Sequence, residues 1–194
     1  MVLMDAEQTF TSGNLSSGVD AQTKRFRMEH VVPAKYYLSL RLEHVYLESI
    51  RFGGQDVTRV PLDLAYGGIE NLQIVLGAKP GVVQATVRNR NGDVMPRVLV
   101  ALWPEVADLG TSNSGVRVVT TNDLGNARFI GLRPEKYRVA AFKEVEAAFV
   151  RSPDFLDRFK GRAVEVTVTE GGSFTPALEA ISRDDAAVAI RNLP

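Results

Sequence analysis

Apolar and polar residues alternate along most of this chain, and a period of two is typical of β-strands with one buried face. Three such runs are clear in the second half: Val83, Ala85 and Val87; Val98, Val100 and Leu102; Tyr137, Val139 and Ala141. Turn residues separate the runs, as in Asn91-Gly92 and in Asn122-Asp123-Leu124-Gly125. Asn, Asp and Gly adopt the backbone conformations that tight turns need. The pattern predicts an all-β fold.

One stretch departs from the period of two. Phe155, Leu156 and Phe159 have helical spacing, and Ser152 followed by Pro153 is typical of a helix start. The sequence therefore predicts one short helix between strands of the second half.

A motif recurs at an offset of 101 residues. An alternating strand followed by Pro-x-Lys-Tyr occurs at residues 26–36 and again at residues 127–137. Further strand-like runs and a Gly-Gly turn follow each copy, at Gly67-Gly68 and at Gly171-Gly172. A repeat of this length predicts tandem domains rather than the short units of a solenoid.

The residues from Gly77 to Gly81 have the composition of a linker and separate the two copies. We therefore predict two tandem β-sandwich domains. The first, truncated, covers residues 1–77, the second covers residues 80–182, and residues 183–194 form a tail or linker. Because the first copy lacks the opening strands of the second, we expect the chain to be a fragment of a longer protein.

Composition narrows the possible functions. The chain has 23 basic and 23 acidic residues, whereas nucleic-acid binders show a basic excess, so we expect no nucleic-acid partner. It contains no cysteine, which excludes disulfides and thiol nucleophiles. No apolar run approaches the roughly 20 residues that cross a bilayer, so we expect no membrane insertion by this segment. Residues 1–8 lack the features of a secretory signal.

Several residues of the second half form a recognisable series: Val87, Asn91-Gly92, the run from Val98 to Pro104, Asp123-x-Gly125, Phe129, Gly131-Leu132, Pro134, Tyr137 and Glu170-Gly171-Gly172. This series resembles the carboxypeptidase regulatory-like domains, prealbumin-type β-sandwiches related to the Cna B-type repeats of large bacterial surface proteins. The resemblance covers residues 80–182, and residues 1–77 as a truncated second copy. It implies that both domains are Greek-key β-sandwiches of Ig-like or prealbumin-like type. Two positions depart from the family pattern. The usual Gly after the proline is Ala34 in one copy and Glu135 in the other, and Ala127 stands where an aromatic residue is more common.

The sequence offers no catalytic motif. A zinc carboxypeptidase needs a His-x-x-Glu pair and a distant His, whereas this chain has only His30 and His44, and Glu48 lies one residue too far from His44. Neither a nucleophile elbow nor a phosphate-binding loop is present. We expect no catalytic residue, no metal ligand, no cofactor and no enzymatic activity.

Aromatic side chains are the remaining candidates for ligand contact, because sugar rings stack on exposed aromatic faces. Trp103 ends a strand just before Pro104, and Tyr46 and Tyr66 lie in the first half. These three residues form the candidate ligand-binding set. For Trp103 the alternative is a ring that caps the core of the sandwich or packs under the loop of residues 104–115.

Two functions fit these observations. The first is a non-catalytic structural or interaction module of a larger exported bacterial protein. Its partners would be neighbouring domains of the longer chain, and a protein or a glycan. The second is a carbohydrate-binding module of the starch-binding-like β-sandwich class. The family resemblance implies an extracytoplasmic location, at the cell surface, in the periplasm or secreted.

Overall fold

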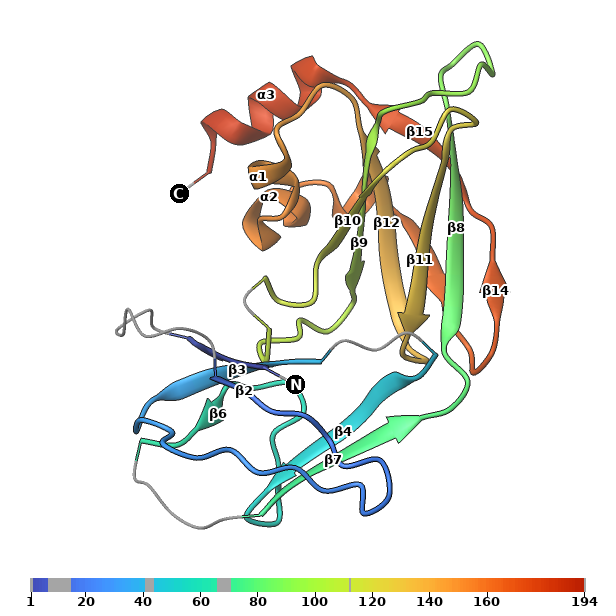
Figure 1. Ribbon diagram of the computed structural model, residues 1–194. Helices are drawn as coiled ribbons and strands as arrows, with labels where there is room; N and C mark the ends of the chain where they lie inside the picture. Colours follow the sequence, from blue (N-terminus) through green and yellow to red (C-terminus); the bar gives the residue numbers. More distant parts are fainter. Residues whose placement is uncertain (1, 7–14, 41–43, 66–70, 112, 194) are drawn as a thin grey trace.

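The computed structural model describes residues 2–6, 15–40, 44–65, 71–111 and 113–193. Two lobes follow one another along the chain (Figure 1). We call the described residues of 2–77 the first lobe and those of 81–193 the second lobe. In these residues strands dominate and helices are short, which confirms the predicted all-β sandwich class with a short helix.

The first lobe contains two small sheets. One has the strand order β2–β1–β3–β6, with β1 at Val2–Asp5, β2 at Leu15–Ser16, β3 at Lys35–Ser39 and β6 at Leu62–Asp63. The other has the order β5–β4–β7, with β4 at Tyr46–Phe52, β5 at Gln55–Asp56 and β7 at Leu72–Gly77. Leu3, Tyr36, Leu38, Ile50 and Leu62 form the buried core of this lobe.

The second lobe has more strands than the first, and more of its apolar side chains are buried. Its strand path is β10–β9–β12–β15–β8–β11, and β13 and β14 add to β12 and β8. The bounds are β8 Gly81–Arg88, β9 Leu99–Pro104, β10 Arg117–Thr120, β11 Asn126–Leu132, β12 Lys136–Phe142, β13 Val164–Thr167, β14 Ser173–Phe174 and β15 Ala177–Ile181.

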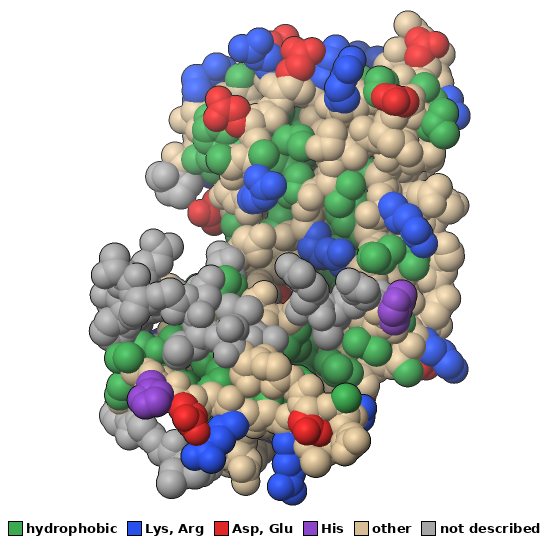
Figure 2. Space-filling model, viewed as in Figure 1, with side chains coloured by type: hydrophobic (Ala, Val, Ile, Leu, Met, Phe, Trp, Pro, Cys, Tyr) green, Lys and Arg blue, Asp and Glu red, His purple; other side chains and the backbone are tan. Residues whose placement is uncertain are grey.

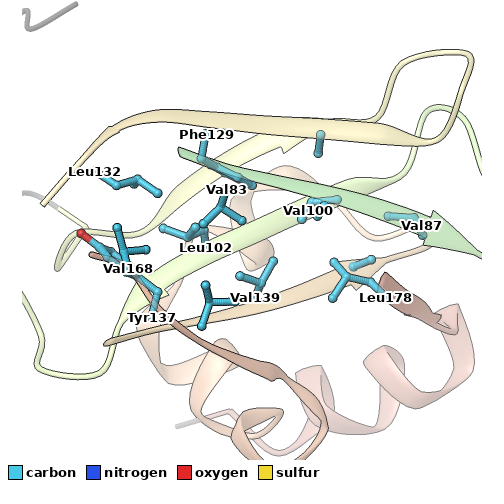
Figure 3. Close-up of a cluster of buried hydrophobic side chains, with 14 of the residues drawn as sticks. Val83, Val87, Val100, Leu102, Phe129, Leu132, Tyr137, Val139, Val168 and Leu178 are labelled. Carbon is cyan, nitrogen blue, oxygen red and sulfur yellow. The ribbon is translucent and has the colours of Figure 1, made fainter. Parts of the chain in front are cut away.

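Side chains from six of these strands meet in one core (Figure 3). In β8 the alternation is strict, because Val83, Ala85 and Val87 are all fully buried while Gln84 is exposed. Burial of one such Val or Leu stabilises the fold by about 1.5–3 kcal/mol. Since the core includes residues of β8, β9, β11, β12, β13 and β15, it also fixes how the strands of this lobe stack.

Short helices cover the other face of β9 and β12 (Figure 1). They are α1 at Ala147–Val150, α2 at Pro153–Asp157, the 3-10 turn η1 at Lys160–Arg162 and α3 at Arg183–Arg191. Phe142 of β12 lies 5.3 Å from both Phe155 and Phe159, measured between ring centroids. The predicted helix near residues 153–159 is therefore present and anchored by aromatic packing, and Pro153 stands in its first turn.

Residues 183–194 were expected as a tail or linker, and most of them instead form α3. The Ser182 hydroxyl accepts a hydrogen bond from the Asp185 backbone N–H at 3.2 Å, which caps the helix. Ala186 is buried, and Ala189 and Ile190 pack against the same core as Phe142. No helix in the described part of the chain has the length and apolar character needed to cross a membrane.

The two Pro-x-Lys-Tyr motifs form the same local arrangement. β3 begins at Lys35 and pairs with β1 on one side and β6 on the other, both antiparallel. β12 begins at Lys136 and pairs in the same way with β9 and β13. Tyr36 lies opposite Leu62, as Tyr137 lies opposite Val166.

Candidate functional site

A pocket of about 370 Å³ lies between the lobes. The first lobe contributes mainly apolar side chains to it, among them Met4, Leu40 and Leu47. The second lobe contributes polar and charged residues from the loop after β9, from β10, from the turn between β11 and β12 and from β12, among them Asp108, Arg117, Arg133, Glu135 and Tyr137. The two walls therefore differ in chemistry.

Arg59 connects the first lobe to the charged wall of the pocket. One of its guanidinium nitrogens forms an ion pair with Glu135 of the second lobe. Its other terminal nitrogen donates a hydrogen bond to the Val106 carbonyl at 2.7 Å. Only 15% of the Glu135 side chain is exposed, so this contact is shielded from water more than a surface ion pair.

The ion pairs continue within the second lobe. The Arg133 guanidinium lies 3.3 Å from a Glu135 carboxylate oxygen and 3.6 Å from an Asp108 carboxylate oxygen. Positive and negative charges thus alternate along the series of ion pairs Arg59–Glu135–Arg133–Asp108. Each carboxylate faces an arginine, so their charges are balanced inside the protein. We call these four residues the interlobe ion network.

Burial shifts several pKa values in this region. Burial raises the pKa of Asp108, although the charges of Arg133 and Arg59 oppose the shift. Burial also raises the pKa of Tyr137, and the nearby Glu135 carboxylate adds to the effect. The pKa of Arg117 is lowered by burial, and its guanidinium donates to the Ile130 carbonyl at 2.7 Å.

The loop between β9 and β10 reaches from the second lobe to the first (Figure 1). At Gly110 a Cβ atom would lie 3.2 Å from the Thr58 carbonyl oxygen and 3.3 Å from that of Val60, so the two backbones nearly touch there. The Gly110 N–H donates to the Asp108 carboxylate at 3.2 Å, which fixes the loop beside the ion network. Backbone approach and ion pairing thus join the lobes at the same place.

A second junction lies where β7 leads into β8. The Tyr46 ring packs on Gly77 so closely that a Cβ atom there would lie 2.0 Å from the ring carbon Cζ. The Lys79 carbonyl accepts a hydrogen bond from the Gly171 N–H at 2.8 Å, and the Gly172 carbonyl accepts one from the Val82 N–H at 2.9 Å. The connection between the lobes is therefore short and hydrogen-bonded to the second lobe.

The predicted aromatic set does not form an exposed platform in the described residues. Trp103 is only 6% exposed and belongs to the core beneath the helices, because both faces of β9 are covered. Tyr46 is 8% exposed, since its ring packs on Gly77. Tyr66 lies outside the described residues. Neither described ring offers a free face for stacking on a sugar.

Histidine and acidic side chains in the described part of the chain form no metal site. His30 and His44 are exposed, and no group of three or more His, Asp or Glu side chains among the described residues is arranged to hold a metal ion. Figure 2 shows basic and acidic side chains interspersed over the end of the second lobe that lies far from the first, without a large patch of one sign on that face. Every buried side-chain nitrogen or oxygen in the described residues has a hydrogen-bond partner.

Sequence patterns did not indicate the interlobe ion network. Arg59 and Glu135 lie 76 positions apart, and no local periodicity links them. The only local signal was an acidic residue, Glu135, directly after Pro134 of the second Pro-x-Lys-Tyr motif, where the first motif has Ala34. That residue supplies the carboxylate that binds Arg59.

Comparisons with known proteins add structural similarities. No family model matches the chain, and no curated protein matches it in sequence. The structure is similar to the Streptococcal ancillary pilin at 12% identity and a TM-score of 0.37, over 86% of this chain and 50% of that one. It is similar to the group B streptococcus pilus 2b backbone protein at 10% identity and a TM-score of 0.36, over 64% of this chain and 48% of that one.

A third similarity is to the Bacillus anthracis TIE protein, at 13% identity and a TM-score of 0.35, over 57% of this chain and 19% of that one. The chain thus spans half or less of the length of these three proteins.

Proposed function

We propose that this chain is a non-catalytic structural and interaction module of a larger exported bacterial protein. In this role residues 1–77 and 80–182 are tandem β-sandwich domains of carboxypeptidase regulatory-like type. The lobes are held in one orientation, so that the module positions neighbouring domains of the longer chain.

The observation that carries this proposal is the ion pair of Arg59 with Glu135. Arg59 also donates to the Val106 carbonyl, so one side chain of the first lobe bonds two points of the second. Partial burial strengthens such contacts, because water screens them less than at the surface. The close approach of Gly110 to the 58–60 backbone adds a contact that does not depend on charge.

Tandem copies are supported by the shared pairing around Tyr36 and Tyr137. Export is supported by the resemblance of residues 80–182 to domains of bacterial surface proteins. The alternative, a carbohydrate-binding module, is not favoured, since Trp103 and Tyr46 are buried.

A distance measurement between spin labels tests the fixed orientation. The chain has no cysteine, so Gln55→Cys in the first lobe and Asn91→Cys in the second provide two specific labelling positions, both exposed. Pulsed electron resonance should give one narrow distance distribution. Arg59→Ala should broaden it, whereas Arg162→Ala, which breaks an exposed ion pair within the second lobe, should leave it unchanged. A broad distribution without any ion-pair substitution would contradict the proposal.

Export needs a separate test. Antibodies against this chain should label intact cells that produce the full-length protein as strongly as permeabilised ones. Labelling only after permeabilisation would refute the extracytoplasmic part of the proposal and leave the fixed orientation as a separate result.

A further inference from the structure

We propose that the pocket between the lobes binds a small carboxylic acid with an apolar body. The carboxylate pairs with Arg117 of the second lobe, and the apolar body lies against the first lobe. This binding function goes beyond the structural role proposed above, and it rests on the lobes keeping the arrangement that forms the pocket.

The charges on the second-lobe wall do not cancel among the described residues. Glu135 contacts Arg59 and Arg133, and Asp108 contacts Arg133. With two arginines and two carboxylates, the interlobe ion network carries no net charge. Arg117 lines the same pocket, and it forms no ion pair with any residue that the structure describes. The wall therefore presents one positive charge that a ligand can match.

A backbone contact holds the Arg117 guanidinium in place. One of its nitrogens donates to the Ile130 carbonyl at 2.7 Å, where the register of β11 against β8 shifts between Phe129 and Leu132. The remaining N–H groups of this guanidinium have no hydrogen-bond partner in the described residues. Because every buried side-chain nitrogen in these residues has a partner, the nitrogens that carry those groups are accessible to solvent. A carboxylate can bond them without breaking a protein contact.

The surroundings of Arg117 favour an anion. Burial lowers the pKa of Arg117, because its charge is less well solvated and no carboxylate of the described residues offsets the loss. A bound carboxylate would supply the missing negative charge. In a partly shielded place such a charge-assisted hydrogen bond is stronger than at the surface.

The opposite wall of the pocket carries no charge in the described residues. It comes from β1, β3, β4 and the residue after β3, and its lining residues are Met4, Tyr37, Leu38, Ser39, Leu40 and Leu47. An apolar body that covers this wall removes apolar surface from water, which favours binding. A carboxylate on this side would lose its water without gaining a cation. The two walls therefore orient the acid.

The volume of the pocket limits the size of the acid. About 370 Å³ is near the lower end of the roughly 300–1,000 Å³ of ligand pockets. Acids such as octanoate and 3-phenylpropionate combine one carboxylate with a compact apolar body. An extended peptide would instead bring its amide groups against the uncharged wall, at a cost in solvation.

Isothermal titration calorimetry on the full chain tests the proposal. The probes are octanoate and 3-phenylpropionate, with the uncharged octanamide and 3-phenylpropionamide as matched controls. At least one acid should bind with half-saturation below about 1 mM, and at least about tenfold more tightly than its own amide. Acetate, which lacks the apolar body, should bind at least about tenfold more weakly than that acid.

Three variants assign the two walls. Arg117→Gln removes the charge but keeps an amide that can donate to the Ile130 carbonyl, and it should weaken acid binding at least about tenfold. Met4→Gln keeps the length of the side chain, makes the first-lobe wall more polar and should weaken binding of acid and amide alike. Arg128→Gln removes an exposed arginine of β11 that does not line the pocket, and it should change neither.

Methyl labelling of methionine locates the bound acid in the unmodified chain, so the test stands even if Arg117→Gln does not fold. Met4 lines the pocket, whereas Met28 packs against the core of the first lobe and Met95 against that of the second. In nuclear magnetic resonance spectra, titration with the acid should shift the Met4 methyl signal and leave those of Met28 and Met95 in place.

Four results would overturn the proposal. They are half-saturation above about 1 mM for both acids, equal affinity for acid and amide, an unshifted Met4 signal, and equal losses in Arg117→Gln and Arg128→Gln. The last would mean that the acid follows the overall charge and occupies no defined site. A narrow spin-label distance together with any of these results would leave the proposed structural function standing.

Discussion

Tyr36 and Tyr137 occupy the same place in the two lobes, and each hydroxyl donates a hydrogen bond to the carbonyl four residues earlier. The distances are 2.7 Å from Tyr36 to Val32 and 3.2 Å from Tyr137 to Arg133. In both cases the acceptor directly precedes the motif proline, whose nitrogen cannot donate. In each lobe this hydrogen bond holds the residue before the motif proline against the strand that begins after the proline.

Removing either hydroxyl should destabilise its lobe. Tyr36→Phe and Tyr137→Phe should each lower the free energy of unfolding by about 1–2 kcal/mol, because a shielded carbonyl loses its donor. Urea denaturation monitored by circular dichroism measures the loss. Tyr37→Phe is the matched control, since no hydrogen bond of its hydroxyl is found among the described residues, and it should change stability by less than about 0.5 kcal/mol. An equal loss in all three variants would show that the hydroxyl contacts contribute nothing specific.

The turn at Gly125 should tolerate a side chain less well than the turn at Gly92. Both glycines have positive φ angles, 71° and 88°, so alanine is strained at either position. A Cβ at Gly125 would in addition lie 2.9 Å from the Val87 carbonyl oxygen, whereas nothing lies within 4 Å at Gly92. Gly92→Ala should cost about 1 kcal/mol and Gly125→Ala about 2–4 kcal/mol in thermal or urea unfolding. Equal costs would mean that the backbone around Gly125 relaxes.

Stability should fall at alkaline pH through Tyr137. Burial raises the pKa of this phenol in the folded state, while in the unfolded state it ionises near pH 10. Above about pH 10 the unfolded chain therefore loses a proton that the folded chain keeps. The free energy of unfolding should fall by up to about 1.4 kcal/mol per pH unit from this group. Tyr137→Phe should reduce the slope by that amount, and an unchanged slope would contradict the assignment.

The ion pair between Arg59 and Glu135 should contribute more to the free energy of unfolding than an exposed ion pair does. Arg59→Ala should lower the free energy of unfolding by about 1–2 kcal/mol, because it leaves Glu135, only 15% exposed, with one arginine instead of two. Arg90→Ala breaks a pair with Glu179 in which both side chains are more than half exposed, and should cost less than about 0.5 kcal/mol. Urea titrations measure the loss in free energy of unfolding for each variant. A smaller loss for Arg59→Ala than for Arg90→Ala would exclude a stabilising role for Arg59.

Alternation of apolar residues was sufficient to predict the strands of the second lobe, because each inward position of β8 is buried. The turn at Gly125 and the helix after Ser152 were also predictable, because the residues that form them are neighbours in the sequence and favour a turn and a helix start. α3 was missed because its charged first turn masks a weak apolar stripe at Ala186, Ala189 and Ile190, which only the core beneath it makes effective.

The burial of Trp103 also depends on tertiary structure. A residue at the end of an alternating strand is expected to be exposed on one side, but α1 and α2 cover that side of β9. The interlobe ion network lay beyond sequence analysis for a similar reason, because Arg59 and Glu135 approach only when both lobes are folded.

In the described residues one edge of β7 is unpaired, which bears on the proposed interaction function, and hydrogen exchange measures this directly. Since the Asn71 carbonyl faces β4, the Ile74 amide faces the unpaired edge, whereas the Leu178 amide of β15 lies beside β8. We predict that in the free protein the Leu178 amide is strongly protected, whereas the Ile74 amide exchanges at close to the rate of an exposed amide. Equal, strong protection of the two amides would contradict the account.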